Sequence, residues 1–325
     1  MTSKHQHTVN SEASVAKLLP VREAGAHKWG VGGLVIVAGS QTYVGAAALT
    51  SMAAGRAGAG IITLAIPRGA IGVVASLVPE VVFIPLRDGE AGTSARAAIE
   101  AIKPKLERSH ALLIGPGLGE DEHTEALLSA IFGIGPAARP VSVGFQRRGN
   151  AAATSDSSES LLSAERPTVV DADALNWLAK QPDWFERVPA HSLVLTPHAG
   201  EMARLLDRPV DDILANPVQA AIDAAQKWGQ TVVLKVGATV ATDGETTVIA
   251  DDAPASLATA GSGDVFSGFI AGMAAQGAAP LDAAAIAMFA GTRAARRIEA
   301  RFGVRGLVAS DLPSTMAEVI AALDA

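Results

Sequence analysis

The chain has 325 residues, a net charge of −7 at pH 7 and no cysteine, and 49% of its residues are hydrophobic. This composition can bury the core of one α/β domain, so we expect a single domain over 1–325. The acidic balance disfavours binding to nucleic acid. Without cysteine, disulfides, thiolate metal sites and cysteine nucleophiles are excluded. The first twenty residues are polar, which disfavours a signal peptide, and the most apolar long window, 44–66, contains Arg56. We therefore expect a cytoplasmic protein without a membrane span.

Apolar runs alternate with stretches of helical periodicity along most of the chain. Continuous apolar runs bounded by glycine or proline are typical of strands that are buried on both faces. The expected strands are 34–38, 60–66, 81–85, 111–114, a strand beginning at Thr168, 192–195, 231–236, and a hairpin of 240–242 and 246–250 around Asp243-Gly244. The expected helices are 12–19, 44–58, 70–77, 94–107, 201–206, 217–228, 265–276, 282–301 and 311–323.

This alternation predicts an α/β fold with a central, mostly parallel sheet and helices on both faces. In such sheets ligands bind at the carboxyl ends of the strands. Before the first strand we expect a tail, a short helix capped by Ser11 and a glycine-rich loop at 27–33. The pattern breaks at 133–166, which is rich in proline, serine and charge. We interpret this stretch as a mobile surface insertion, with a lid or a partner-binding loop as alternatives.

The segment Thr259-Ala260-Gly261-Ser262-Gly263-Asp264 precedes the apolar run 265–275. Glycines allow several backbone N–H groups to converge, and the helix that follows adds the positive end of its dipole. Together they predict an anion hole for a phosphate, with Asp264 at its rim as the base of a phosphoryl transfer. We expect the helix dipole to keep Asp264 ionised at neutral pH. The alternative is structural, with Ser262 as an ordinary N-cap and Asp264 as an ordinary first-turn acid.

Other candidates follow the expected strands. Gly115-Pro116-Gly117-Leu118-Gly119 is a glycine-rich turn where a ligand can approach the backbone. Lys235 ends a buried strand, so a phosphate partner is plausible, and Thr239 can add a hydroxyl to the same ligand. His198 and Glu201 open a helix, where each can also serve as a simple cap. Asp171 and Asp173 can hold Mg²⁺, but acids after a strand also cap helices, and we favour the cap.

As a set these stretches resemble the ADP/ATP-dependent (S)-NAD(P)H-hydrate dehydratase family of the ribokinase-like superfamily. The matching motifs, in order, are HKWGVGGLVIVAGS (27–40), GAAALTSMAAGRAGAGIITLAIP (45–67), IGPGLG (114–119), VVDADALN (169–176), LTPHAGE (195–201), LKVGAT (234–239) and ATAGSGDVFSGFIAG (258–272). One motif alone is a weak match, whereas seven in order over roughly residues 15–323 are specific. The resemblance implies a ribokinase-like three-layer α/β/α fold.

The resemblance also implies a repair activity, in which hydrated NADH or NADPH is dehydrated to NAD(P)H at the expense of ADP or ATP. Phosphorylation of the hydrate's hydroxyl is followed by loss of phosphate. By this similarity Asp264 is the catalytic base, and Mg²⁺ is the cofactor, with Glu201 keeping the acid of the family's metal-ordering motif. The hydrate contacts Ala46, Gly117, His198 and Asp264. The adenine nucleotide contacts Lys235, Val236, Gly237, Ala238 and Thr239, with Gly261, Ser262 and Gly263 at its phosphates.

The resemblance leaves several points open. The sequence does not settle ADP against ATP, and the resemblance to bacterial members favours ADP. A homo-oligomer, such as a tetramer, is expected. The epimerase domain of some bacterial relatives is not found in the sequence, so epimerisation of the hydrate is assigned to a separate protein. The approach to the anion hole, 253–258, departs from the family's Asn- and Gly-rich pattern, which affects the shape of the nucleotide pocket. A small-molecule kinase of the same fold, of the hydroxyethylthiazole or pyridoxal type, is the alternative enzyme, and a nucleotide-sensing scaffold is the alternative without catalysis.

Overall fold

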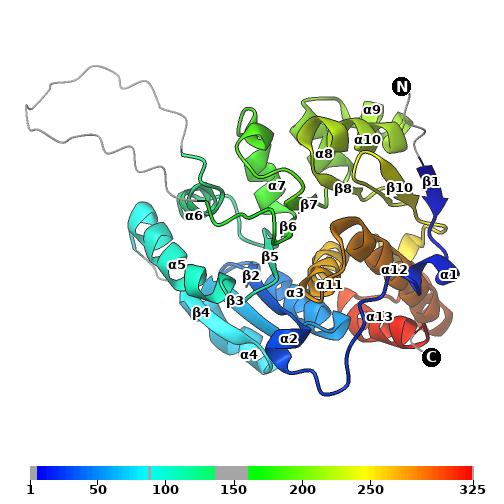
Figure 1. The fold of residues 1–325 in the computed structure, drawn as a ribbon, viewed down its shortest axis with the longest axis horizontal. Helices are drawn as coiled ribbons and strands as arrows, with labels where there is room; N and C mark the ends of the chain where they lie inside the picture. The colour runs from blue at the N-terminus through cyan, green and yellow to red at the C-terminus, as the bar shows by residue number, and fades with distance from the viewer. Residues whose placement is uncertain (1–5, 87–88, 136–159, 324–325) are drawn as a thin grey trace, which may run out of the picture.

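The strands form one sheet in the computed structural model, which describes residues 6–86, 89–135 and 160–323 (Figure 1). Their bounds are β1 Gln6–Val9, β2 Gly33–Val37, β3 Ile61–Pro67, β4 Val82–Leu86, β5 Ala111–Ile114, β6 Thr168–Val170, β7 Leu193–Leu195, β8 Thr231–Leu234, β9 Val240–Thr242 and β10 Thr246–Ile249. The order across the sheet is β1-β10-β9-β8-β7-β6-β5-β2-β3-β4. The pairs from β8 to β4 are parallel, whereas β9 runs antiparallel to both β8 and β10. The predicted α/β class with a mostly parallel sheet is confirmed.

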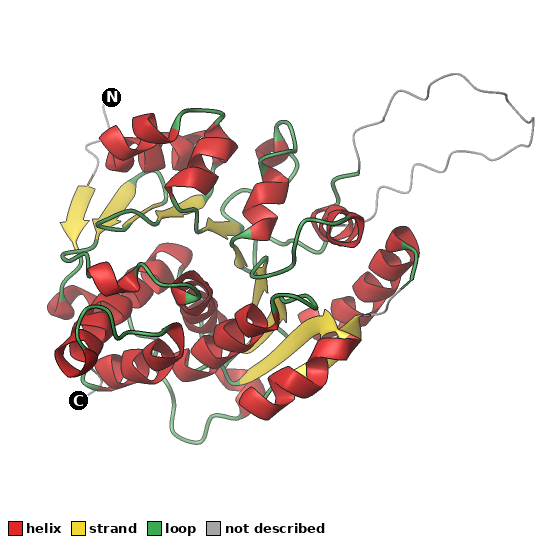
Figure 2. Cartoon of the chain, turned by 180° about the vertical axis from the view of Figure 1, so that it is seen from behind, coloured by secondary structure: helices red, strands yellow, loops and turns green. Residues whose placement is uncertain are grey.

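Helices cover both faces of this sheet (Figure 2). Their bounds are α1 Glu12–Val15, α2 Lys28–Val31, α3 Val44–Ala57, α4 Ile71–Leu77, α5 Ala91–Leu106, α6 Glu122–Phe132, α7 Asp173–Leu178, α8 Ala199–Leu206, α9 Val210–Ala215, α10 Pro217–Trp228, α11 Ser262–Ala275, α12 Pro280–Phe302 and α13 Leu312–Ala321. In Figure 1, α7–α10 lie above the sheet and α11–α13 below it.

Two hydrophobic cores lie on opposite faces of the sheet, as the side-chain alternation of β2 illustrates. Leu34 and Ile36 belong to the core shared with α3, α4 and α11–α13. Val35 and Val37 belong to the core shared with α5–α10. Successive residues of a strand point to opposite faces, so a strand between two helical layers must be apolar throughout. This explains why continuous apolar runs predicted the strands well.

The N-terminal segment is more ordered than the sequence predicted. Residues 6–9 form β1, which pairs in parallel with β10, where we expected a tail. Asn10 is buried, and its side-chain amide donates to the carbonyl of Ala285 at 2.7 Å. The Ser11 cap is confirmed, but α1 ends at Val15 rather than at Leu19. The expected loop at 27–33 contains the short helix α2, with His27 as its N-cap.

The interpretation of 133–166 as a surface insertion is wrong at both of its ends. Ile134, Leu161 and Leu162 are buried in the core beside α6. Arg166 donates through its guanidinium to the carbonyl oxygens of Leu106 and Leu161 at 3.1 and 2.9 Å. The remainder of the predicted mobile segment, 136–159, lies outside the described residues. The polar composition of 133–166 therefore concealed two short apolar segments, one at each end, that pack into the core.

The glycines of α11 allow a close crossing with α3. A Cβ atom at Gly268 would lie 2.3 Å from the carbonyl oxygen of Thr50, and one at Gly272 would lie 2.7 Å from that of Ala54. Only a residue without a side chain fits at these separations. The crossing fixes the first turn of α11, which carries the predicted anion hole, relative to the sheet.

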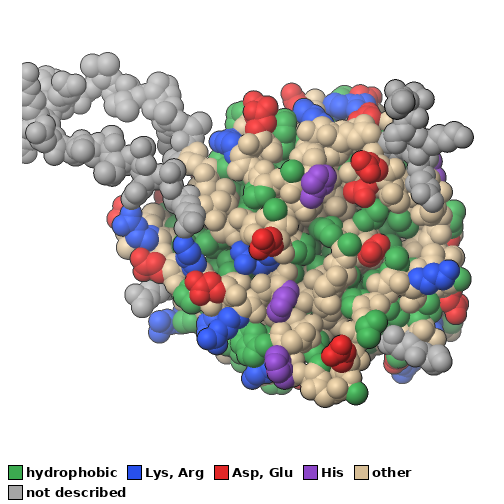
Figure 3. Space-filling view, viewed as in Figure 1, with side chains coloured by type: hydrophobic (Ala, Val, Ile, Leu, Met, Phe, Trp, Pro, Cys, Tyr) green, Lys and Arg blue, Asp and Glu red, His purple; other side chains and the backbone are tan. Residues whose placement is uncertain are grey.

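The surface carries mixed charges. On the face drawn in Figure 3, acidic and basic side chains are interspersed. The arginines that the sequence groups on α12 are used in ion pairs: Arg293 with Asp251, and Arg296 with Asp252 at 2.6 Å. Within the described residues, no helix is long and apolar enough to cross a membrane.

We predict that Gly268→Ala lowers the free energy of unfolding by about 1–3 kcal/mol, because the new methyl group overlaps the backbone of Thr50 and forces the two helices apart. Gly72→Ala is the matched control. Gly72 also lies in a helix but is exposed, and a Cβ atom there meets nothing within 4 Å. The free energy of unfolding of this control should rise by about 0.4–1 kcal/mol. Urea denaturation of both variants checks this, and equal stabilisation of the two would show that the crossing has room for a side chain.

Candidate active site

The predicted site residues follow the carboxyl ends of adjacent parallel strands. The glycine-rich turn 115–119 follows β5, Asp171 follows β6, His198 follows β7 and Lys235 follows β8. These strands are neighbours in the sheet. Parallel strands bring their carboxyl ends to one edge of the sheet, which is where ligands bind in such folds. The topology therefore brings together groups that lie more than a hundred residues apart in sequence.

Lys235 forms an ion pair with Asp171 beneath the anion hole. Its Nζ lies 2.7 Å from Oδ1 of Asp171, whose side chain is 1% exposed, while that of Lys235 is 21% exposed. The backbone holds the lysine as well, because its N–H donates to the carbonyl of Pro197 at 2.8 Å. Burial alone would lower the pKa of Lys235, but the carboxylates of Asp171 and Glu201 outweigh this effect and raise it. The side chain is therefore a fixed cation.

The glycine loop lies beside this cation. A Cβ atom at Gly263 would be 3.5 Å from Nζ of Lys235. Gly261 is the N-cap of α11 with φ of 88°, and no side chain caps this helix. Ser262 is not the N-cap, because its hydroxyl donates to the carbonyl oxygens of Leu257 and Thr259 at 2.7 and 2.9 Å. An uncapped helix start next to a fixed ammonium is suited to bind a phosphate group.

Asp264 lies in the first turn of α11 and has an unusual protonation equilibrium. Burial and the carboxylate of Asp171 raise its pKa to about 7, against the opposing effect of Lys235. Our expectation that the helix dipole keeps this carboxylate fully ionised at neutral pH does not hold, because burial raises its pKa to about 7. A carboxylate with a pKa near neutrality can both take up and release a proton, which is the property that a general base requires.

His198 and Glu201 form a capping box at the start of α8. Nδ1 of His198 accepts from the N–H groups of Gly200 and Glu201, and Oε2 of Glu201 accepts from the N–H of His198 at 2.8 Å. Burial and the nearby charge of Lys235 lower the pKa of His198, so its ring is neutral at pH 7. Glu201 is 5% exposed, and burial raises its pKa. The structural alternative for both residues is thus present, and it also holds the ring of His198 in place. The backbone of His198 forms an isolated β-bridge with that of Lys235.

The two acids after β6 have separate structural tasks. Asp171 pairs with Lys235, whereas Oδ2 of Asp173 accepts from the N–H of Gly119 at 2.8 Å and so holds the glycine-rich turn. Ala172 between them has φ of 50°, a strained value for a residue with a side chain, and this turn directs the two carboxylates to different partners. The expectation that these acids cap the helix is wrong, because Ala172 is the N-cap of α7 and no side chain caps this helix. No local pattern marks the positive φ at Ala172 that separates the two carboxylates.

Magnesium fits these residues only as an ion held mainly by phosphate. Across 6–86, 89–135 and 160–323, no group of three or more His, Asp or Glu side chains is placed to hold a metal ion. Mg²⁺ commonly takes one or two carboxylates and completes its shell with water and substrate phosphates. Glu201 and Asp264 both interact electrostatically with Lys235, so both carboxylates lie near the expected phosphate position.

The remaining predicted residues lie at two other places along this edge. Gly117 contacts α3, since a Cβ atom there would be 2.7 Å from the Cβ of Ala46. Val236, Gly237, Ala238 and Thr239 form the loop between β8 and β9, directly after Lys235, and the middle two are exposed. Gly237 and Ala238 are therefore open to a ligand that extends from the anion hole over β8.

Comparison with known proteins identifies the family. The sequence model of the family described as NAD(P)H-hydrate dehydratase matches residues 34–135 and 144–318. The chain belongs to this family. The bifunctional NAD(P)H-hydrate repair enzyme Nnr of Moorella thermoacetica is 37% identical over 301 residues, which cover 90% of this chain and 50% of that protein. The chain spans about half the length of curated relatives that it matches.

Solved structures confirm the ribokinase-like fold. A ribokinase-like superfamily protein from Enterococcus faecalis superposes with a TM-score of 0.74 at 19% identity, covering 98% of this chain and 96% of that one. An ADP/ATP-dependent NAD(P)H-hydrate dehydratase from Bacillus subtilis, co-crystallised with ATP and Mg²⁺, superposes with a TM-score of 0.74 at 23% identity, covering 96% and 97%.

We predict that the Lys235–Asp171 pair is energetically coupled. Lys235→Met and Asp171→Asn should each lower the free energy of unfolding by about 1–3 kcal/mol, because each leaves a desolvated charge without its partner. The double variant should lose less than the sum, with a coupling of about 0.5–3 kcal/mol.

The exposed pair Lys180–Glu120 is the control for this cycle, since its atoms lie 2.9 Å apart but both side chains are more than half exposed. Its coupling should fall between about 0 and 1 kcal/mol. Urea denaturation of both cycles checks the prediction, and additive effects at Lys235 and Asp171 would contradict it.

Proposed function

We propose that this protein is a nucleotide-dependent (S)-NAD(P)H-hydrate dehydratase that acts in nicotinamide nucleotide repair. The carrying observation is the joint placement of Asp264 and Lys235 at the uncapped start of α11 in a chain of this family. The proposed co-substrate is ADP, which yields AMP and phosphate, and Mg²⁺ is the proposed cofactor. It would be held by Glu201 and the nucleotide phosphates, and when bound it supplies neutralisation of phosphate charge.

The proposed chemistry assigns each group of the chain a task. The hydroxyl of the hydrate attacks the terminal phosphorus of the nucleotide, and the bond from this phosphorus to the bridging oxygen breaks. Asp264 accepts the proton of the attacking hydroxyl. Lys235 and the N–H groups at Gly263 stabilise the charge on the transferring group. The phosphorylated hydrate then loses phosphate and a proton from the neighbouring ring carbon, which restores the double bond.

The hydrate is proposed to lie against Ala46, Gly117 and His198. Gly117 and Ala46 are in contact, and the backbone of His198 is bridged to that of Lys235, whose charge helps to lower the pKa of the His198 ring. The adenine nucleotide is proposed to extend from Gly261, Ser262 and Gly263 over the loop from Val236 to Thr239. We further propose a functional link to an NAD(P)H-hydrate epimerase, because the curated relatives are bifunctional. A homo-oligomer is proposed from the family resemblance alone.

The test uses NADH hydrate, ADP and Mg²⁺, with the return of reduced-nicotinamide absorbance and the release of phosphate as readouts. Equal molar amounts of NADH and phosphate support the dehydratase. A phosphorylated product without recovery of absorbance would identify a small-molecule kinase of the same fold instead.

We predict that Asp264→Asn lowers turnover by about 10²–10⁴-fold, because the amide keeps the shape of the carboxylate but cannot accept the proton. Affinity for ADP, measured by calorimetry, should be kept or improved, since a negative charge near the phosphate is removed. The control is Asp282→Asn, which changes the partly buried acid at the same position in the first turn of α12. A variant at Asp264 with more than about a tenth of normal turnover would exclude this residue as the base.

A further inference from the structure

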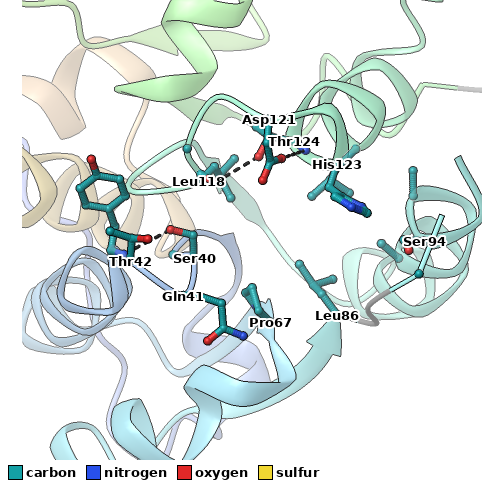
Figure 4. Close-up of a pocket in the computed structure, with 17 residues that line it drawn as sticks. Ser40, Gln41, Thr42, Pro67, Leu86, Ser94, Leu118, Asp121, His123 and Thr124 are labelled. Carbon is teal, nitrogen blue, oxygen red and sulfur yellow. Dashed lines mark hydrogen bonds between the residues drawn. The ribbon is translucent and has the colours of Figure 1, made fainter. Parts of the chain in front are cut away.

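A cavity opens at the same edge of the sheet, beside the residues assigned so far. Its volume is about 330 Å³, and it lies between the ends of β2, β3 and β4 and the first turns of α5 and α6 (Figure 4). In the order of the sheet, this position is on the β5-β2-β3-β4 side, whereas Lys235 follows β8, with β7 and β6 between them. The cavity is thus separate from the proposed phosphate position.

The walls of this cavity suit a flat heteroaromatic group. Leu86, Leu118 and Leu127 provide apolar surface, and the last two are largely buried. Gln41 and His123 add polar side chains at the rim. Oγ of Ser94, which also lines the cavity, is buried and has no hydrogen-bond partner among the described residues. Ser40, Thr42, Asp121 and Thr124 line the cavity as well, so its wall is part apolar and part polar. A cavity of this size with apolar surface and polar groups, one of them unsatisfied, is typical of a small-molecule site.

Helix α3 connects the cavity to the reaction centre. Tyr43 lines the cavity, Ala46 contacts Gly117, and Leu49 packs against the position of Gly261, where a Cβ atom would lie 2.6 Å from its Cδ1. These residues are spaced by three, so they lie along one face of the helix. From Tyr43 to Leu49 the helix rises about 9 Å. The glycine-rich turn runs along the same path, because Leu118 and Gly119 line the cavity and Gly117 precedes them.

We propose that this cavity binds the adenosine half of the dinucleotide substrate while the hydrated nicotinamide half reacts at Asp264. This inference rests on the proposed function and extends it. A dinucleotide carries two nucleosides joined by a pyrophosphate, so the second nucleoside must lie some distance from the reacting ring. The turn 115–119, with three glycines at positive φ, exposes the backbone between the two places. The adenosine of ADP is a different group, since its phosphates lie at α11 on the β8 side.

The test compares two substrates that share the reacting ring. Ser94→Phe places a ring in the cavity, and Thr93→Phe, its exposed neighbour on α5 that does not line the cavity, is the control. The substrates are NADH hydrate and the hydrate of reduced nicotinamide mononucleotide, which lacks adenosine. For Ser94→Phe we expect the KM of the dinucleotide to rise by about tenfold or more, because the new ring occupies the space of the adenosine and removes its apolar contacts. The KM values of the mononucleotide and of ADP should stay unchanged, and so should all values for Thr93→Phe.

The outcomes separate this inference from the proposed function. An equal rise for both hydrates, or no rise for either, would overturn the assignment of the cavity. A rise confined to ADP would assign it to the co-substrate instead. If neither hydrate is turned over by the unchanged protein, the proposed function fails, and the cavity is then tested by binding of NADH alone to the same variants. Gln41→Trp, which narrows the cavity from the opposite wall, gives a second variant should Ser94→Phe not fold, and the same pattern is expected for it.

Discussion

The ion pair between Lys235 and Asp171 is the interaction on which the site depends. Removing two charges from water is costly, and their close contact offsets this cost only when the geometry is fixed. Here β6 and β8 fix it from both sides, because each residue directly follows its strand. The pair holds a cation beside Gly263, and the charge of its carboxylate raises the pKa of Asp264. One contact thus sets both the attraction for a phosphate and the proton affinity of the base.

Close packing between α3 and α11 also determines the geometry of the site. The small residues at the crossing bring α11 down onto α3, so that its first turn reaches the edge of the sheet. The same face of α3 carries Tyr43, Ala46 and Leu49, which contact the cavity, the glycine-rich turn and the glycine loop in turn. A shift of this helix would therefore move the whole path between the cavity and Asp264. Small side chains here serve the geometry of the site as well as the core.

The sequence predicted regular structure well where the chain is buried on two faces. The run 34–38, the hairpin around Asp243-Gly244 and the last three helices are found within a few residues of the expected bounds. Prediction from the sequence failed where contacts between distant parts of the chain determine the local structure. Strand β1 is polar and pairs only because β10 offers an edge, and Leu161 and Leu162 lie next to a polar segment that masked them.

The motifs also predicted which residues gather at the site, but not their charge states. Propensity and spacing placed Asp264 at a helix start, where the dipole favours ionisation. Burial and the neighbouring Asp171, which arrives from a strand end 93 residues earlier in the chain, reverse this preference. The pairing of Lys235 with Asp171 is equally a property of sheet order, which local sequence does not encode. The roles assigned to these residues remain predictions.

The most direct test is the pH dependence of kcat/KM for NADH hydrate in the unchanged protein and in Asp171→Asn. This quantity reports the ionisation of the free enzyme. With Asp264 as the base at a pKa of about 7, activity should fall tenfold per pH unit below neutrality. Removing the carboxylate of Asp171 removes a negative charge that raises this pKa, so the acidic limb should move to lower pH. An acidic limb that stays in place in Asp171→Asn, or one that is missing around pH 7 in the unchanged protein, would contradict the coupling of the ion pair to the base.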